Sequence, residues 1–234
     1  MNRIRYGQLC PIAKAAEVLG ERWTILIIRE LLLGNSRYSG LQRALSRLSP
    51  TLLTRRLKEL EACGLVHRKR VSGRARPEYA LSPAGRELEP VVLRLGQWGM
   101  KWARGQMRPA ELDVQMLMVD FARRIDPAQL PGRRTVLEFN LPGLPKFSRW
   151  WIVLEPDGTH ELCVNHPGRA VDLVLRLDLP TLAEIWTGDL SVPAARRKGC
   201  LEVSGDPVLD RTLARWLRPG GLAHIRPHPA GLKV

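Results

Sequence analysis

One stretch limits the possible folds of this chain most: an amphipathic helix that begins at a proline and is followed directly by a basic hairpin. Ser49 is a favourable N-cap residue, and Pro50 suits the first helical position, where its missing N–H would have no partner. Gly64 suits the left-handed conformation that ends many helices. The pattern therefore predicts a helix over residues 50–62.

The two sides of this helix differ in chemistry. Leu53, Leu57 and Leu60 share one side, as in a helix that packs on a core. Hydroxyl and cationic groups lie opposite or on the flank near the N-terminus: Thr51, Thr54, Arg55 and Lys58. Such groups suit phosphates and base edges in a DNA major groove, although a solvated basic face has the same pattern.

The chain after this helix predicts a two-stranded basic wing. Residues 65–71 predict one strand, residues 72–77 a turn, and residues 78–81 the returning strand. The hairpin carries five cations, Arg68, Lys69, Arg70, Arg74 and Arg76. Beside a recognition helix, they could reach the DNA backbone or the adjacent minor groove. A basic hairpin in this position is stronger evidence for DNA binding than a basic hairpin alone.

Three helices are expected before this stretch and one after it. Residues 12–19 predict a short amphipathic helix, residues 23–33 an apolar helix at the centre of the core, and residues 38–45 the first helix of a helix-turn-helix. Residues 83–104 predict a long helix with a kink at Pro90. It carries more apolar residues than a small domain needs: Leu88, Val91, Val92, Leu95, Trp98, Gly99 and Trp102. This stripe predicts a dimerisation helix, and packing on a second domain of the same chain is the alternative.

The positive charge of the chain is concentrated in its first half. The 234 residues carry a net charge of +14, and residues 1–104 hold 20 Lys and Arg against 8 Asp and Glu. Residues 105–234 hold 17 against 15. This asymmetry indicates a polyanionic partner for the first half, either nucleic acid or an anionic membrane.

Several motifs of the first half together resemble a known family. They are Cys10-Pro11, Gly20-Glu21-Arg22-Trp23-Thr24, Tyr38-Ser39-Gly40-Leu41, Leu53-Thr54-Arg55-Arg56-Leu57-Lys58-Glu59-Leu60-Glu61, Gly64-Leu65-Val66 and Glu78-Tyr79-Ala80-Leu81-Ser82-Pro83. Residues 10–104 resemble the HxlR-type family of bacterial winged helix-turn-helix regulators, which implies a homodimeric DNA-binding protein. Some members of that family sense oxidants or electrophiles through a cysteine at the position of Cys10. The resemblance makes Cys10 a candidate redox sensor, and an unreactive buried thiol is the alternative.

The second half predicts an α+β domain. Residues 112–125 predict a helix with Leu112, Met116, Val119 and Ile125 on one side. Strands are expected over residues 134–140, 149–154, 159–164, 170–178 and 201–203, and helices over residues 180–186 and 207–217; residues 194–199 form a basic segment. This order places helices on one face of a sheet.

The segments Asp178–Asp189 and Gly199–Asp206 resemble the sterol-carrier-protein fold, over about residues 130–218. The resemblance implies a site for a hydrophobic small molecule and hence an effector-binding domain. A domain that is kept only for structure or dimer stability is the alternative.

Other classes of function have little support. The chain has no apolar run long enough for a transmembrane helix and no convincing signal peptide. Its four cysteines are widely spaced and form no CxxC pair, so a soluble protein in the reducing cytoplasm is expected. Cys163 and His166 are too few for a zinc site. No nucleophile elbow, phosphate loop or dinucleotide motif is present, so neither an enzyme nor a cofactor is expected.

The sequence therefore predicts an α+β transcriptional regulator with no metal or membrane partner. It divides into a winged helix-turn-helix domain over residues 1–104, an effector domain over residues 105–218 and a loose tail over residues 219–234. Thr51, Thr54 and Arg55 are expected to contact bases. Phosphates are expected to contact Ser49, Lys58, Arg68, Lys69, Arg70, Arg74 and Arg76. A lipid carrier whose basic half docks on anionic membrane is the alternative.

Overall fold

The computed structural model describes residues 5–71 and 77–232, so the wing cations Arg74 and Arg76 lie outside the described residues. The chain divides into two compact units, residues 1–96 and 97–234. Each unit has its own hydrophobic core. The two units are therefore described separately.

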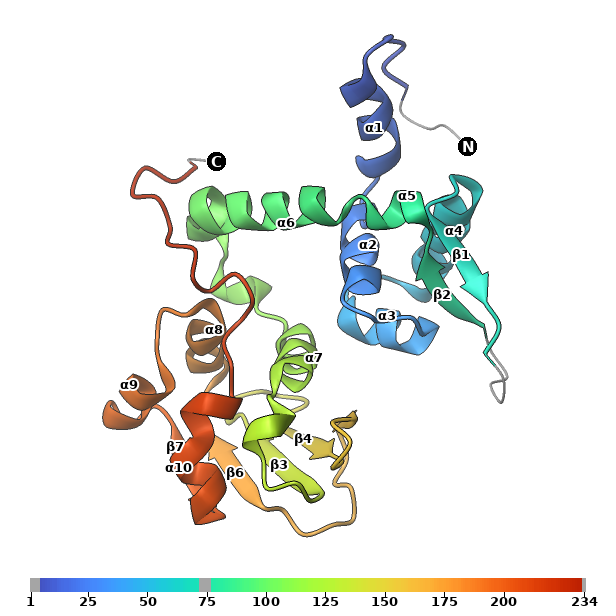
Figure 1. Ribbon diagram of the computed structural model, residues 1–234. Coiled ribbons are helices and arrows are strands. Elements are labelled where there is room, and N and C mark those ends of the chain that lie inside the picture. Colours follow the sequence, from blue (N-terminus) through green and yellow to red (C-terminus); the bar gives the residue numbers. More distant parts are fainter. Residues whose placement is uncertain (1–4, 72–76, 233–234) are drawn as a thin grey trace. The chain divides into compact units, whose positions relative to one another are not determined.

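The first unit contains a helix-turn-helix and a two-stranded wing (Figure 1). Its elements are α1 (Pro11–Leu19), α2 (Thr24–Leu32), α3 (Tyr38–Ala44), α4 (Pro50–Ala62), β1 (Val66–Lys69), β2 (Glu78–Leu81), α5 (Pro83–Arg86) and α6 (Glu89–Trp98), the last of which extends past residue 96. Strands β1 and β2 pair antiparallel, with Val66 opposite Leu81. Helix α1 projects away from the other helices of this unit (Figure 1). The order of elements agrees with the sequence prediction.

The core of the first unit forms between α2, α3, α4 and the wing. Ile27, Ile28 and Leu41 are fully buried, and Leu53, Leu57 and Leu60 are at most 2% exposed. The apolar side of the predicted helix 50–62 therefore faces this core, as predicted. Gly64 follows the helix with φ 72°, so the prediction of a left-handed helix end is confirmed. Trp23, expected inside a helix, lies at the N-cap of α2 in the left-handed conformation with φ 79°.

The long helix predicted over residues 83–104 is broken into shorter pieces. Helix α5 ends at Arg86 and α6 begins at Glu89, immediately before Pro90. Because Pro90 has no N–H to donate to the carbonyl four residues earlier, the helix is interrupted there rather than gently kinked. A π-helical turn (η1, Gly99–Ala103) and a 3₁₀ turn (η2, Arg104–Gln106) follow α6.

The second unit is a five-stranded mixed sheet with helices. Two 3₁₀ turns, η3 (Pro109–Glu111) and η4 (Pro127–Gln129), flank its first helix. The remaining elements are α7 (Val114–Arg124), β3 (Thr135–Asn140), β4 (Arg149–Leu154), β5 (His160–Cys163), β6 (Leu173–Arg176), α8 (Leu179–Thr187), α9 (Val192–Arg197), β7 (Glu202–Gly205) and α10 (Pro207–Trp216). The strand order is β5-β4-β3-β6-β7, and only the β3–β6 pair among these is parallel.

Side chains alternate between the two faces of this sheet. Leu137, Phe139 and Ile152 pack with α7, α8 and α10 in the large core of the unit. Val136, Trp151 and Val153 form a smaller cluster on the other face. Helices therefore gather on one face of the sheet, which confirms the predicted α+β arrangement.

Two features of this unit differ from the sequence prediction in detail. Helix α7 begins at Val114, so Leu112 lies before it; Met116 is half-buried and packs against the large core, Ile125 is buried, and the fully covered apolar side chains of the helix are Leu117, Met118, Phe121 and Ala122. The helix is apolar around much of its surface, so periodicity alone could not choose the buried face. The basic segment 194–199 lies largely in α9, a helix that was not predicted although Ser191 and Pro193 are typical of a helix start.

The tail after residue 218 contains no helix or strand among its described residues. Its backbone is nevertheless hydrogen-bonded within the second unit: Gly220 N–H to the Trp186 carbonyl at 2.8 Å, and Leu232 N–H to the Trp102 carbonyl at 2.8 Å. The His228 and Trp102 rings stack with centroids 4.2 Å apart. That this tail is loose in solution stays a prediction.

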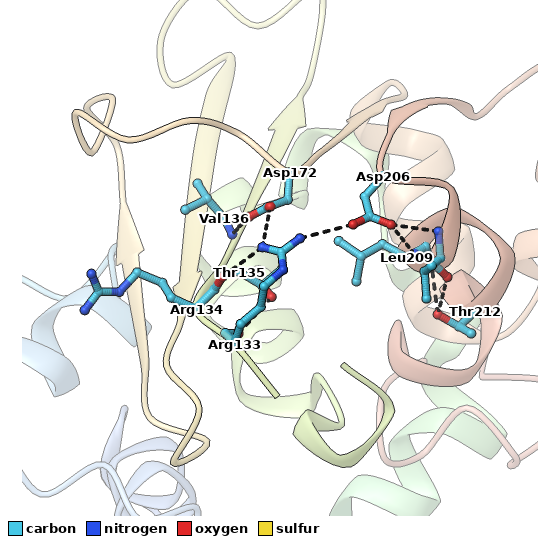
Figure 2. A network of polar contacts seen from close by, with 9 residues as sticks. Arg133, Arg134, Thr135, Val136, Asp172, Asp206, Leu209 and Thr212 are labelled. Carbon is cyan, nitrogen blue, oxygen red and sulfur yellow. Dashed lines mark hydrogen bonds and ion pairs between the residues drawn. The ribbon is translucent and has the colours of Figure 1, made fainter. Parts of the chain in front are cut away.

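An arginine joins three elements of the second unit (Figure 2). Arg133 Nη1 donates to Asp172 Oδ1 at 2.6 Å, and Nη2 donates to Asp206 Oδ2 at 3.1 Å. Asp172 accepts the Val136 N–H at 2.7 Å, and Asp206 caps α10 by accepting the Val208 N–H at 2.7 Å. The network thus holds the start of β3, the segment before β6 and the N-terminus of α10 together.

This network predicts a loss of stability in acid that depends on Asp206. The backbone N–H groups of Val208 and Leu209, with Arg133, lower the pKa of Asp206 below its ordinary value. The stabilisation is therefore complete above the unfolded pKa of about 3.9 and is lost as pH falls through the lower folded pKa. We expect the melting temperature of Asp206→Asn to fall less steeply than that of the wild type between about pH 5 and pH 2. Calorimetry that gave parallel pH profiles would contradict this role.

Candidate nucleic-acid interface

Helix α4 begins with a side-chain cap and exposes its polar side. The Ser49 hydroxyl accepts the Leu52 N–H at 3.3 Å, so the predicted N-cap is confirmed. Thr51, Arg55 and Lys58 are exposed, and their side lies opposite the buried leucines. A hydroxyl, a guanidinium and an ammonium group therefore share the exposed side of the second helix of the helix-turn-helix.

The Thr54 hydroxyl is engaged within the helix-turn-helix. Thr54 Oγ1 donates to the Pro50 carbonyl at 2.9 Å and lies 3.2 Å from the Tyr38 hydroxyl. Tyr38 itself donates to the Pro50 carbonyl at 2.8 Å, which ties α3 to the first turn of α4. No role for Tyr38 at this surface was predicted from the sequence.

Two adjacent arginines of α4 have opposite environments. Arg55 is exposed, and its Nε donates to Glu59 Oε1 at 2.9 Å. Arg56 is only 7% exposed, and its Nη1 donates to Glu59 Oε2 at 2.5 Å. Burial raises the pKa of Glu59, but the hydrogen bonds from both arginines outweigh it and hold that pKa below the ordinary value. Glu59 is therefore an anion at neutral pH with a cation on each oxygen.

The wing is tied to the end of α4 by a bidentate pair. Arg68 of β1 donates from Nε and Nη2 to the two oxygens of Glu61 at 2.8 and 3.0 Å. The hydrogen bond to Glu61 raises the pKa of Arg68, and the guanidinium carbon lies 5.9 Å from the centre of the Tyr79 ring. Lys69 and Arg70 are exposed. Among the described wing cations, Arg68 is thus held in place while its neighbours face solvent.

Strand β2 is also linked to the start of the helix-turn-helix. Glu78 accepts a hydrogen bond from the Ser36 hydroxyl at 2.9 Å and one from Arg37 Nε at 3.4 Å. The Tyr79 N–H donates to the Ser36 carbonyl at 2.8 Å. Recognition helix and wing are therefore joined to one framework, as a DNA-binding surface of fixed shape requires.

Cys10 lies outside this framework, at the N-cap of α1. Cys10 is half-buried, and its side chain makes no capping hydrogen bond to α1. Lys14, one turn along, pairs with Glu17 at 3.0 Å. No group of three His, Cys, Asp or Glu side chains within residues 5–71 and 77–232 could hold a metal ion.

Besides Tyr38, the residues that hold the cations of α4 and the wing in place were not predicted from the sequence: Arg56, Glu59 and Glu61. The Arg55–Glu59 spacing of four and the Arg56–Glu59 spacing of three are signals for side-chain pairs on a helix. The Arg68–Glu61 pair has no such local signal, because strand pairing and the position of the wing bring it together.

Comparison with known proteins identifies the family. A model described as HxlR-like helix-turn-helix matches residues 18–107. The HTH-type transcriptional regulator YvaP of Bacillus subtilis (strain 168) is 38% identical over 98 residues, which are 41% of this chain and 91% of that protein. The chain belongs to the HxlR-like helix-turn-helix family. It is thus an HTH-type transcriptional regulator, and the prediction of a non-enzymatic chain agrees with this family.

Other proteins match a similar share of the chain. The HTH-type regulator Mb3122 of Mycobacterium bovis (strain ATCC BAA-935 / AF2122/97) is 43% identical over 89 residues, covering 38% of this chain and 56% of that protein. The solved structure of PA1607, a putative transcription factor, is 30% identical, covers 46% of this chain and 73% of that chain, and has a TM-score of 0.40. The HxlR match ends at residue 107, before the sheet of the second unit. No helix among the described residues is long and apolar enough to cross a membrane.

Proposed function

We propose that this HxlR-type regulator binds a specific double-stranded DNA operator as a homodimer. The observation that carries the proposal is the exposed side of α4, where Thr51, Arg55 and Lys58 lie opposite a fully packed leucine face. Thr51, Thr54 and Arg55 read base edges. Phosphates are held by Ser49, Lys58, Arg68, Lys69, Arg70, Arg74 and Arg76.

The test is selection of a duplex from a random-sequence library with the full-length protein. We expect one enriched, near-palindromic motif that binds much more tightly than a scrambled duplex of the same composition. The affinity should fall steeply with salt, because each neutralised phosphate releases counterions. A library without enrichment, together with tight binding to vesicles that contain anionic lipid, would instead support docking on a membrane.

The homodimer rests on apolar side chains that the first unit leaves exposed. Val91 and Leu95, one turn apart on α6, are 44% and 46% exposed, and Ile12 of α1 is 79% exposed. Within residues 88–98, all of which the structure describes, Leu88 and Val92 are the side chains that pack against the core of the first unit. A second copy that covers these side chains would remove them from water and place two recognition helices on two half-sites.

The second unit is proposed as an effector domain of the sterol-carrier-protein type. Support comes from the helices gathered on one face of its sheet, over the largest apolar cluster of the chain. A hydrophobic small molecule would enter between these layers. Native mass spectrometry of the purified protein tests this point, since a ligand-free chain that also binds no hydrophobic probe would contradict it.

Cys10 is proposed as a second input. Cys10 is a free, half-buried cysteine directly before the first helix. We expect hydrogen peroxide, which oxidises a single thiol to a sulfenic acid and is itself reduced to water, to lower the operator affinity of the wild type and to leave that of Cys10→Ser unchanged. Equal inhibition of both proteins would exclude Cys10 as the sensor.

A further inference from the structure

Glu59 joins the exposed arginine of α4 to the buried one. Its Oε1 accepts from Arg55 Nε at 2.9 Å and its Oε2 accepts from Arg56 Nη1 at 2.5 Å. The Glu59 side chain is 19% exposed, against 52% for Arg55 and 9% for Arg56. Because both carboxylate oxygens are engaged, Glu59 cannot rotate without breaking a charge-assisted hydrogen bond.

Arg56 is anchored at its other end to the turn between α1 and α2. Its Nη2 lies 2.7 Å from Glu21 Oε2, and its Nε donates to the Arg22 carbonyl at 3.0 Å. The next residue, Trp23, has φ 79°, which costs a non-glycine residue energy and persists only where its surroundings hold it. All three guanidinium nitrogens of Arg56 therefore have a partner within the first unit.

These contacts leave Arg55 little freedom before DNA is bound. A free arginine on a helix surface samples many rotamers, and ordering one on binding costs conformational entropy. Glu59 removes much of that freedom, and it leaves the two terminal nitrogens of Arg55 available, since only Nε is bonded to Glu59. Those two nitrogens are suited to bidentate contact with a guanine.

We propose that Glu59 is a positioning residue that orients Arg55 for base recognition, with Arg56 and the Glu21–Arg22 turn as its fixed support. The proposal rests on the proposed function, because it assumes that Arg55 contacts bases. It assigns part of the sequence discrimination to an acidic residue that would otherwise only weaken attraction to DNA. Through Arg56, the turn between α1 and α2 would also help to hold the Arg55 side chain in position.

The test is Glu59→Gln in the full-length protein, assayed with the selected duplex and its scrambled counterpart. Loss of a negative charge should keep or raise affinity for the scrambled duplex, while the ratio of the two affinities falls about three- to tenfold. The matched control is Glu61→Gln, which removes the same charge two residues away and frees Arg68 instead. We expect the control to change both affinities together and leave their ratio within twofold.

A double-mutant cycle separates positioning from general electrostatics. In the Arg55→Ala background, Glu59→Gln should leave the ratio unchanged, because no side chain remains to be oriented. An unchanged ratio in the single variant, or an equal loss in the Arg55→Ala background, would overturn the role of Glu59. Wild-type protein that binds both duplexes equally would instead overturn the proposed function itself.

Glu59→Asp covers the case in which Glu59→Gln does not fold at the assay temperature. It keeps the charge on a shorter side chain that cannot reach both arginines as Glu59 does. We expect it to lose part of the discrimination while the salt dependence stays that of the wild type. Full wild-type discrimination by Glu59→Asp would overturn the proposal.

Discussion

Arg55→Ala is expected to abolish most of the preference of this protein for its operator over scrambled DNA. A bidentate arginine contact to a base contributes about 1–3 kcal/mol of discrimination, so the affinity ratio should fall by roughly 10- to 100-fold. The side chain is exposed and outside the core, so the melting temperature should change little. Fluorescence anisotropy with both duplexes measures the ratio directly.

The matched comparison for Arg55→Ala is a wing cation. Arg74→Ala and Lys69→Ala should weaken binding to both duplexes about equally and reduce the salt slope by about one unit, as expected for phosphate contacts. If Arg55→Ala also weakened both duplexes equally, its assignment to base recognition would be wrong.

The second large effect is expected from Leu95→Glu. This substitution places a charge in the exposed apolar face of α6, where Leu95 is 46% exposed and lies one turn from Val91. We expect the protein to become monomeric by light scattering. A monomer binds only one half-site at a time, and losing that linkage should weaken binding to the full operator by about 100-fold or more.

The control for Leu95→Glu is the same change at an exposed apolar residue elsewhere. Val208 on α10 is 51% exposed, so Val208→Glu introduces an equal charge on another surface. It should leave the molecular mass in solution and the operator affinity unchanged. A dimeric Leu95→Glu protein with wild-type affinity would show that the exposed face of α6 is not the dimer interface.

The sequence by itself determined the features whose causes are local. Ser49, Pro50 and Gly64 specify where α4 starts and stops, because capping and left-handed turns depend on a few adjacent residues. Its leucine spacing specifies the buried side, and strand β2 begins and ends at the predicted residues, 78 and 81. These features were enough to locate the candidate recognition helix and its polar face.

The tertiary structure decided everything that depends on residues brought together from distant positions. Burial of Arg56 follows from the α1–α2 turn that meets it, and the Arg68–Glu61 pair follows from the place of the wing. Several sides of α7 are apolar, so the side that is buried depends on how the helix packs against the sheet of the second unit. Parallel pairing of β3 with β6 likewise requires a crossover that periodicity does not encode. Local signals identified the basic face of α4 and the Arg55–Glu59 pair within it. Long-range contacts decided that Arg56 is buried and that Glu21 and the Arg22 carbonyl hold it.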